Sequence, residues 1–198
     1  MIVQDQYTSF QGTGLNTGVR QRFVRLAGCS VPCKLRANCD QPEALTKSSW
    51  PDISIEQILD GVGNDTQWLH ITGGEPLDHL GLPQLVMSAM AVGLRVQVQT
   101  SGYRPVEWIG DAVPFLTVSP KTATLYHIPD EYCLISCSWL SFEMALEWVE
   151  RRIPVFVVPE CIDGNPNIPP AIKLAEKLIK CGVDARLSLQ AHLVWNLK

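Results

Sequence analysis

Short runs of β-branched and aromatic residues recur along the chain, and segments with helical spacing separate several of them. Seven runs predict strands, at residues 22–27, 67–72, 94–100, 115–119, 132–137, 154–159 and 186–190. Apolar residues at helical spacing predict helices in segments 55–59, 82–90, 142–149 and 172–179. Strands that alternate with helices indicate βαβ units and a mainly parallel sheet.

Local signals mark the ends of several predicted helices. Ser54 followed by Gln57 forms a capping box at the start of the first one. Gly93 is expected to stop the second. Pro170 lies near the start of the last helix, and Gly182 follows its end.

The number of elements limits the architecture. A complete eight-fold barrel typically needs ~250 residues, and this chain has 198. We therefore predict an α/β fold, a partial (βα)6-type barrel of about six mainly parallel strands, which fits the element count. No linker or repeat divides the chain, so residues 1–198 are expected to form a single domain, and "DGNPNIPP" (163–170) is expected to be a loop.

Composition excludes several function classes. With 46% hydrophobic and 18% charged residues, the chain is typical of globular proteins. A net charge of −4 argues against broad nucleic-acid binding. No apolar run approaches the ~20 residues of a membrane span. The N-terminus has no signal-peptide pattern, so the seven cysteines are expected to stay reduced, as in the cytoplasm.

Three of those cysteines lie close together in "RLAGCSVPCKLRANCDQPE" (25–43), directly after the strand predicted at 22–27. Cys29, Cys33 and Cys39 should therefore lie at the carboxyl end of that strand, where parallel α/β folds bind ligands. Lys34 and Arg36 are expected to favour the thiolate forms. A disulfide would use only two of the three, whereas a metal site could use all of them.

The residues alone leave two metals open. Three thiolates can hold three irons of a cubane iron–sulfur cluster and leave the fourth iron for another ligand. Alternatively, they can bind zinc with a fourth ligand such as His70 or His79. The other cysteines are interpreted as small buried or half-buried side chains, namely Cys133, Cys137, Cys161 and Cys181.

Polar or glycine-rich segments follow four further strands. They are "HITGGEP" (70–76), "QVQTSG" (97–102), "TVSPK" (117–121) and "RLSLQAH" (186–192). Each is a weak signal by itself, and the Gly-Gly pair lacks the Lys-Ser/Thr ending of a nucleotide-binding P-loop. Because the carboxyl ends of parallel strands meet at one edge of a sheet, all of these segments can contribute to one site.

Together these motifs resemble those of the radical S-adenosylmethionine enzymes. The opening "SFQGTGLNTGVRQRFVRLAGC" (9–29) and the closing "RLSLQAH" are similar to the 7-carboxy-7-deazaguanine synthase family, and the resemblance covers nearly the whole chain. It implies that Cys29, Cys33 and Cys39 ligate a [4Fe–4S] cluster. The cluster would bind S-adenosylmethionine and cleave it to a 5′-deoxyadenosyl radical.

The resemblance also implies a set of binding residues. Those for S-adenosylmethionine are Gly73, Gly74, Glu75, Thr100, Ser101, Ser119, Lys121 and Gln190. The implied substrate is 6-carboxy-5,6,7,8-tetrahydropterin, which loses ammonia to give 7-carboxy-7-deazaguanine. Its expected binding residues are Gln11, Gly12, Thr13, Arg25, His192 and Lys198.

Arg25 has a physical reason besides the resemblance, and Lys198 is predicted without it. The planar fork of Arg25 suits the substrate carboxylate. Lys198 is included for its α-carboxylate, which is expected to accept a hydrogen bond from the substrate.

The chain departs from the family pattern at three places. Five residues instead of two separate Cys33 from Cys39. Thr13 stands where the family often has Glu, and the α-carboxylate of Lys198 is expected to compensate for it. Asp40-Gln41 replaces an Asp-Thr or Asp-Ser pair that helps to hold Mg²⁺, so these two residues are the expected magnesium ligands.

The implied partners are a flavodoxin- or ferredoxin-type electron donor and a second copy of the chain in a homodimer, with neither nucleic acid nor membrane bound directly. Two alternatives remain at this point. One is another small radical S-adenosylmethionine enzyme, such as a glycyl-radical activase, and the other is a non-catalytic zinc-binding α/β module.

Overall fold

The structure is a computed structural model that describes residues 1–33, 36–63, 65–122, 125–135, 151–162, 165–195 and 197, without the side chains of Asn38, His192 and Leu193. Its main sheet has eight strands in the order β1-β2-β3-β4-β5-β6-β7-β10. These are β1 (Val3–Phe10), β2 (Arg20–Leu26), β3 (Trp68–Gly73), β4 (Arg95–Thr100), β5 (Phe115–Val118), β6 (Glu131–Ile135), β7 (Val155–Val158) and β10 (Ala185–Leu187). β1 is antiparallel to β2, and every other neighbouring pair is parallel. The predicted α/β fold with mainly parallel strands is confirmed.

The described helices match three of the four predictions. They are α1 (Ile55–Asp60), α2 (Leu82–Ala91), α4 (Ile168–Lys180) and a short α5 (Ala191–Val194). The capping box of α1 is present, because the Gln57 N–H donates to Ser54 Oγ and the Ser54 N–H donates to Gln57 Oε1. The helix predicted at 142–149 lies outside the described residues. Of the helices described, none combines the length and the apolar character that crossing a bilayer requires.

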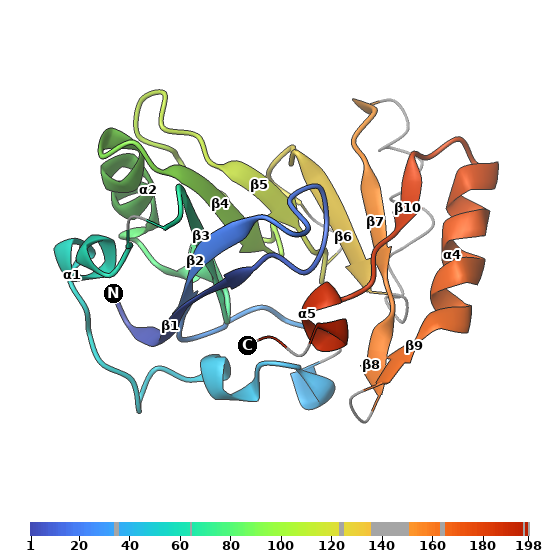
Figure 1. Cartoon of the computed structure of the whole chain (residues 1–198), viewed down its shortest axis with the longest axis horizontal. Coiled ribbons are helices and arrows are strands. Elements are labelled where there is room, and N and C mark those ends of the chain that lie inside the picture. The colour runs from blue at the N-terminus through green and yellow to red at the C-terminus, as the bar shows by residue number, and fades with distance from the viewer. Residues whose placement is uncertain are drawn as a thin grey trace.

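The outer face of the sheet is apolar and packs against helices. Every second strand residue contributes to this core, as with Val24 and Leu26 of β2 and Val96 and Val98 of β4. The buried residues of α2 and α4 cover the face from outside, and Figure 1 shows these helices at opposite ends of the sheet. The apolar residues that predict α4 are Ile172, Ala175, Leu178 and Ile179. Ala175 and Leu178 are buried as expected, but Ile172 and Ile179 are exposed and Ala171 is buried instead.

The inner face is polar at the alternate positions of the same strands. Gln97 of β4 is fully buried, and its Oε1 accepts from Gln21 Nε2 of β2 at 3.0 Å. Its Nε2 donates to Thr117 Oγ1 of β5 at 2.8 Å, and that hydroxyl lies 2.8 Å from Glu131 Oε1 of β6. His70 of β3 joins this layer through Nδ1, which lies 2.7 Å from the side-chain oxygen Oε1 of Gln21. A hydrogen-bonded polar layer therefore crosses five neighbouring strands.

The sequence missed several elements. β1 was not predicted, whereas the seven predicted strand runs match the seven parallel strands described, one more than the barrel estimate of about six. The predicted loop 163–170 is partly wrong, because Asn165–Asn167 forms β9, which pairs with β8 (Glu160–Ile162), and residues 168–170 begin α4. Pro is tolerated in this short two-stranded ribbon and in the first turn of a helix, where no ladder or helical N–H is lost.

Two glycines bring the carboxyl ends of β2 and β3 into close contact. A Cβ at Gly73 would overlap the main chain of Leu26, and one at Gly74 would overlap the carbonyl groups of Gly28 and Ala44. Gly73 also has a φ of +136°, which L side chains rarely adopt. The Gly-Gly pair is therefore a packing requirement of the sheet.

Replacing Gly73 with Ala should destabilise the protein far more than the same change at Gly93. Gly93 also has a positive φ, +86°, but nothing lies within 4 Å of a Cβ added there. We expect Gly93→Ala to cost about 1 kcal/mol from backbone strain alone. Gly73→Ala should cost roughly 1–3 kcal/mol more from overpacking. Urea denaturation of both variants measures the difference, and equal losses would contradict the close-packing argument.

The free energy of unfolding of the protein should decrease as the pH is lowered, because of His70. Burial lowers the pKa of His70 to about 3. Between the ordinary value near 6.5 and this value, the unfolded chain binds a proton that the folded protein does not, so stability is lost as the pH falls through this window. In His70→Gln the free energy of unfolding should decrease less between pH 6.5 and pH 4.5 than in the unmodified protein. Parallel urea titrations at several pH values test this, and identical slopes would refute it.

Candidate active site

One cavity of about 800 Å³ opens at the carboxyl edge of the parallel strands. Its lining includes each sequence-predicted site residue that the structure describes with its side chain. These residues are Gln11, Gly12, Thr13, Arg25, Cys29, Cys33, Cys39, Asp40, Gln41, Gly73, Gly74, Glu75, Thr100, Ser101, Ser119, Lys121 and Gln190. Sequence segments more than 170 residues apart thus meet in one place, as the parallel topology predicts.

The three clustered cysteines lie on the wall of this cavity. All three are half-buried. Within the described ranges, no three His, Cys, Asp or Glu side chains are grouped as ligands of a single metal ion. A [4Fe–4S] cluster has a different requirement, because each thiolate binds a different iron. Thiols that face one cavity without meeting at a point fit that requirement.

Burial outweighs positive charge at Cys29. The pKa of this thiol is raised above its usual value, mainly because burial disfavours the thiolate, and the negative charges of Glu75 and Asp78 add to the effect. The Arg36 guanidinium lowers it only in part. Arg36 therefore favours the thiolate of Cys29, as predicted, but burial outweighs its effect. Lys34, the other residue in that prediction, lies outside the described residues.

Asp78 ties the cysteine loop to the neighbouring strand ends. It lies in the short 3-10 helix η3 (Pro76–Asp78) after the Gly-Gly turn. Its carboxylate accepts from the N–H of Ser30 at 2.7 Å and from the Ser30 hydroxyl at 2.9 Å. It also accepts from the Tyr103 hydroxyl at 2.7 Å and pairs with Arg104 Nε at 2.9 Å. The residue next to Cys29 is thus fixed to the segments that follow β3 and β4.

Glu75 has a similar connecting role deeper in the site. It is buried, and its Oε1 accepts from the Leu77 N–H at 3.0 Å and from the Thr100 hydroxyl. Its Oε2 accepts from the Ser101 N–H at 3.0 Å and from the Ser101 hydroxyl at 2.5 Å. Because a carboxylate offers about four acceptor positions, this one is fully used in joining the Gly-Gly turn to the end of β4.

Aromatic side chains hold Arg25 on the part of the cavity wall that β1 and β2 form. Tyr7 of β1 stacks on Phe23 of β2 with ring centroids 5.1 Å apart, and Phe23 stacks on His70 at 4.6 Å. The Arg25 guanidinium donates to the Tyr7 hydroxyl at 3.0 Å. The half-buried cation therefore lies beside a row of rings in a position to bind an anionic group.

Sequence reasoning missed several residues that line the cavity. They are mainly inward-facing residues in the middle of strands, such as Tyr7, Phe23, Gln99 and Cys133. Burial raises the pKa of the Cys133 thiol well above its usual value, and a hydrogen bond from Thr13 opposes the shift only in part. Cys133 is buried as predicted, Cys181 is half-buried as predicted, and Cys161 is exposed, contrary to the prediction. His70 also lines the cavity, although the sequence suggested it only as a possible zinc ligand.

Several sequence-predicted residues lie outside the described part. Lys198 and Cys137 are among them, and only the backbone of His192 is described, within α5.

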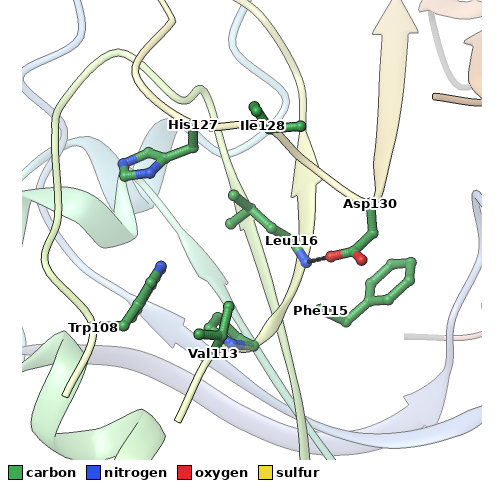
Figure 2. A pocket seen from close by; sticks show the side chains of 8 residues that line it. Trp108, Val113, Phe115, Leu116, His127, Ile128 and Asp130 are labelled. Carbon is green, nitrogen blue, oxygen red and sulfur yellow. Dashed lines mark hydrogen bonds between the residues drawn. The ribbon is translucent and has the colours of Figure 1, made fainter. Parts of the chain in front are cut away.

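A second cavity, of about 430 Å³, lies at the other end of the strands. Figure 2 shows Trp108, Phe115, His127 and Asp130 around it. Asp130 accepts from the Leu116 N–H at 2.7 Å, at the start of β5. None of the predicted site residues lines this cavity.

Comparison with known proteins identifies the family. No family model matches the chain. The 7-carboxy-7-deazaguanine synthase of Pyrobaculum aerophilum is 33% identical, over 79% of this chain and 74% of that protein. The enzyme of the same name from Aquifex aeolicus is 28% identical, over 100% of this chain and 94% of that protein.

A solved structure agrees with these relatives. The crystal structure of QueE from Escherichia coli matches with a TM-score of 0.71 and 24% identity, covering 95% of this chain and 92% of that one, so the two proteins share a fold. The identity and coverage shared with the Pyrobaculum enzyme show the family as well as the fold. This chain belongs to the 7-carboxy-7-deazaguanine synthase family.

Proposed function

We propose that this chain is a radical S-adenosylmethionine lyase that converts 6-carboxy-5,6,7,8-tetrahydropterin to 7-carboxy-7-deazaguanine with loss of ammonia, as a step in queuosine and 7-deazapurine biosynthesis. The observation that carries the proposal is the convergence of the predicted site residues on one cavity. The family relationship supports the same reaction.

Cys29, Cys33 and Cys39 would hold a [4Fe–4S] cluster. When bound, the cluster supplies the electron that cleaves S-adenosylmethionine reductively. The hydrogen bonds from Ser30 to Asp78 fix the start of the cysteine loop before any cluster is present. Asp40 and Gln41 lie on the cavity wall after Cys39 and would provide oxygen ligands for Mg²⁺.

The strand ends beside the cysteine loop would bind S-adenosylmethionine. Glu75 orients Thr100 and Ser101 by accepting a hydrogen bond from each hydroxyl group. The Ser119 N–H donates to the Thr100 carbonyl at 2.8 Å, which fixes Ser119. Lys121 and Gln190 complete this part of the wall. The polar groups are held before the nucleoside binds, which reduces the entropy cost of binding.

The wall formed by β1 and β2 would bind the pterin. Arg25 offers its guanidinium to the substrate carboxylate, and the bond to Tyr7 limits its motion. Gln11, Gly12 and Thr13 lie on the same wall. His192 and Lys198 stay predictions for this part of the site. An electron donor of the flavodoxin or ferredoxin type, a homodimer, a one-domain organisation over residues 1–198 and a cytoplasmic location belong to the same proposal.

Anaerobic reconstitution tests the function. Protein loaded with iron and sulfide should bind about four irons per chain. With reductant, S-adenosylmethionine and carboxytetrahydropterin, it should form 5′-deoxyadenosine and 7-carboxy-7-deazaguanine together, as read by mass spectrometry. Cys29→Ala should lose both the iron and the products, whereas Cys181→Ala, at a half-buried cysteine that does not line the cavity, should keep them.

Two outcomes of this experiment would overturn the proposal. Formation of 5′-deoxyadenosine without the deazapurine would favour another radical enzyme, such as a glycyl-radical activase. Bound zinc without acid-labile sulfide would favour a non-catalytic zinc module.

Substitution of Arg25 should weaken substrate binding selectively. Arg25→Lys keeps the charge but removes the planar fork, so KM for the pterin should rise about 10- to 100-fold, the range expected for a charge-assisted hydrogen bond. Binding of S-adenosylmethionine should be unchanged. Arg186→Lys, at an exposed ion pair with Asp184, is the matched control and should behave as the unmodified protein. An unchanged KM in Arg25→Lys would exclude this role.

A further inference from the structure

The connection between β1 and β2 folds as a hairpin, which we call the inner hairpin (residues 11–19). The Gln11 N–H donates to the Val19 carbonyl at 2.9 Å, and the Gly18 N–H donates to the Gln11 carbonyl at 2.8 Å. The Thr17 hydroxyl closes the turn on the Gly14 carbonyl at 2.7 Å. Figure 1 shows this blue segment leaving the edge of the sheet and extending toward β6. The hairpin is therefore a compact unit placed across the inner face.

The inner hairpin is anchored to strands far from its own. Asn16 Nδ2 donates to Gln97 Oε1 of β4 at 2.9 Å. The Leu15 N–H donates to Glu131 Oε2 of β6 at 2.6 Å. Beyond β10, Ser188 Oγ accepts from the Gly14 N–H at 3.2 Å, and the Ala191 N–H donates to the Gly12 carbonyl at 3.0 Å. Because β1 and β10 are the two edges of the sheet, the hairpin links one edge to the other.

Glu131 is the only carboxylate among these anchors, and the proposed chemistry does not use it. The residue is fully buried, and no Lys or Arg among the described residues forms an ion pair with it. Burial raises the pKa of its carboxyl group. A buried acid without a cation is costly, so its hydrogen bonds to the Leu15 N–H and the Thr117 hydroxyl are its main compensation.

The hairpin also packs tightly against the Glu131 carboxylate at Gly14. Gly14 has a φ of +78°, and a Cβ added there would overlap the Glu131 carboxylate. The hairpin can approach this strand only because residue 14 has no side chain. The same hairpin presents Gln11, Gly12 and Thr13 to the functional cavity.

We propose that Glu131 is a positioning residue for the substrate: it holds the inner hairpin so that Gln11, Gly12 and Thr13 form the pterin-facing wall of the cavity. This inference rests on the proposed function. Glu131 does not line the cavity, so it acts through the hairpin and not on the substrate itself. None of the predicted S-adenosylmethionine residues forms a described hydrogen bond with the carboxylate, so we expect S-adenosylmethionine to bind without the contact between Leu15 and Glu131.

The test compares variants of both partners of the contact. Glu131→Leu removes both acceptors at similar size, whereas Glu131→Gln keeps an amide oxygen for the Leu15 N–H. Gly14→Ala pushes the hairpin away from an intact carboxylate. Asp130→Asn is the matched control, because this neighbouring acid accepts from a backbone N–H at the second cavity (Figure 2) and does not contact the hairpin.

Two measurements are needed, and the first does not depend on activity. In the protein without cofactors, hydrogen exchange of residues 11–18 should accelerate at least about tenfold in Glu131→Leu and Gly14→Ala, because a buried hydrogen bond is lost. Glu131→Gln and Asp130→Asn should stay near the unmodified protein. In the reconstituted enzyme, KM for carboxytetrahydropterin should rise about tenfold or more in the first two variants, with kcat within about twofold and affinity for S-adenosylmethionine unchanged.

The outcomes separate this inference from the proposed function. Unchanged exchange of the hairpin, or loss of S-adenosylmethionine binding in parallel with loss of pterin binding, would overturn the positioning role. If hairpin exchange accelerates as expected while the unmodified protein does not turn over the pterin, the hairpin anchor is supported and the assigned substrate is overturned. Should Glu131→Leu fail to fold, Gly14→Ala tests the same contact from the hairpin side.

Discussion

The buried hydrogen bonds between Gln21, Gln97, Thr117 and Glu131 are the constraint on which the rest of the structure depends. Each of these side chains is almost fully buried, so a broken bond would leave a polar group without a partner. The bonds can form together only when β2, β4, β5 and β6 have their observed register. The polar layer therefore fixes strand positions with a specificity that apolar packing alone does not provide.

The outer face of the sheet contributes mainly to stability, and the inner face forms the binding cavity. On the outer face, residues such as Leu69 and Ile71 of β3 are completely buried against the helix side. Burial of each such side chain is worth about 1.5–3 kcal/mol. On the inner face the same strand presents His70 and Thr72, which line the cavity. A substitution on the outer face thus acts first on stability, whereas one on the inner face acts first on the shape and charge of the site.

The sequence predicts the parallel strands well because their outer residues are β-branched or large apolar, as in "QWLHIT" and "PVFVVP". It fails for β1, "VQDQYTSF", which lies at the sheet edge with mostly half-buried polar residues and has no apolar alternation to recognise. The cavity was predicted through residues just after strands, where glycine and small polar residues form motifs. Inward-facing residues such as Tyr7 and Cys133 form no local motif, because only the topology brings them together. The contact of Leu15 with Glu131 spans 116 positions and has no local signature.

The cysteine loop shows how the fold prepares the site before any cofactor binds. The Gly74 N–H donates to the Leu26 carbonyl at 2.9 Å, and the Glu75 N–H donates to the Gly28 carbonyl at 3.0 Å. These main-chain bonds join the residue before Cys29 to the turn after β3, and they form only because the Gly-Gly pair lets the backbones approach. The first thiol is therefore positioned by the sheet itself. Five residues separate Cys33 from Cys39, yet both line the same cavity as Cys29, so the longer spacing still brings the third thiol to the cavity wall. Part of the entropy cost of assembling a cluster is thereby met during folding.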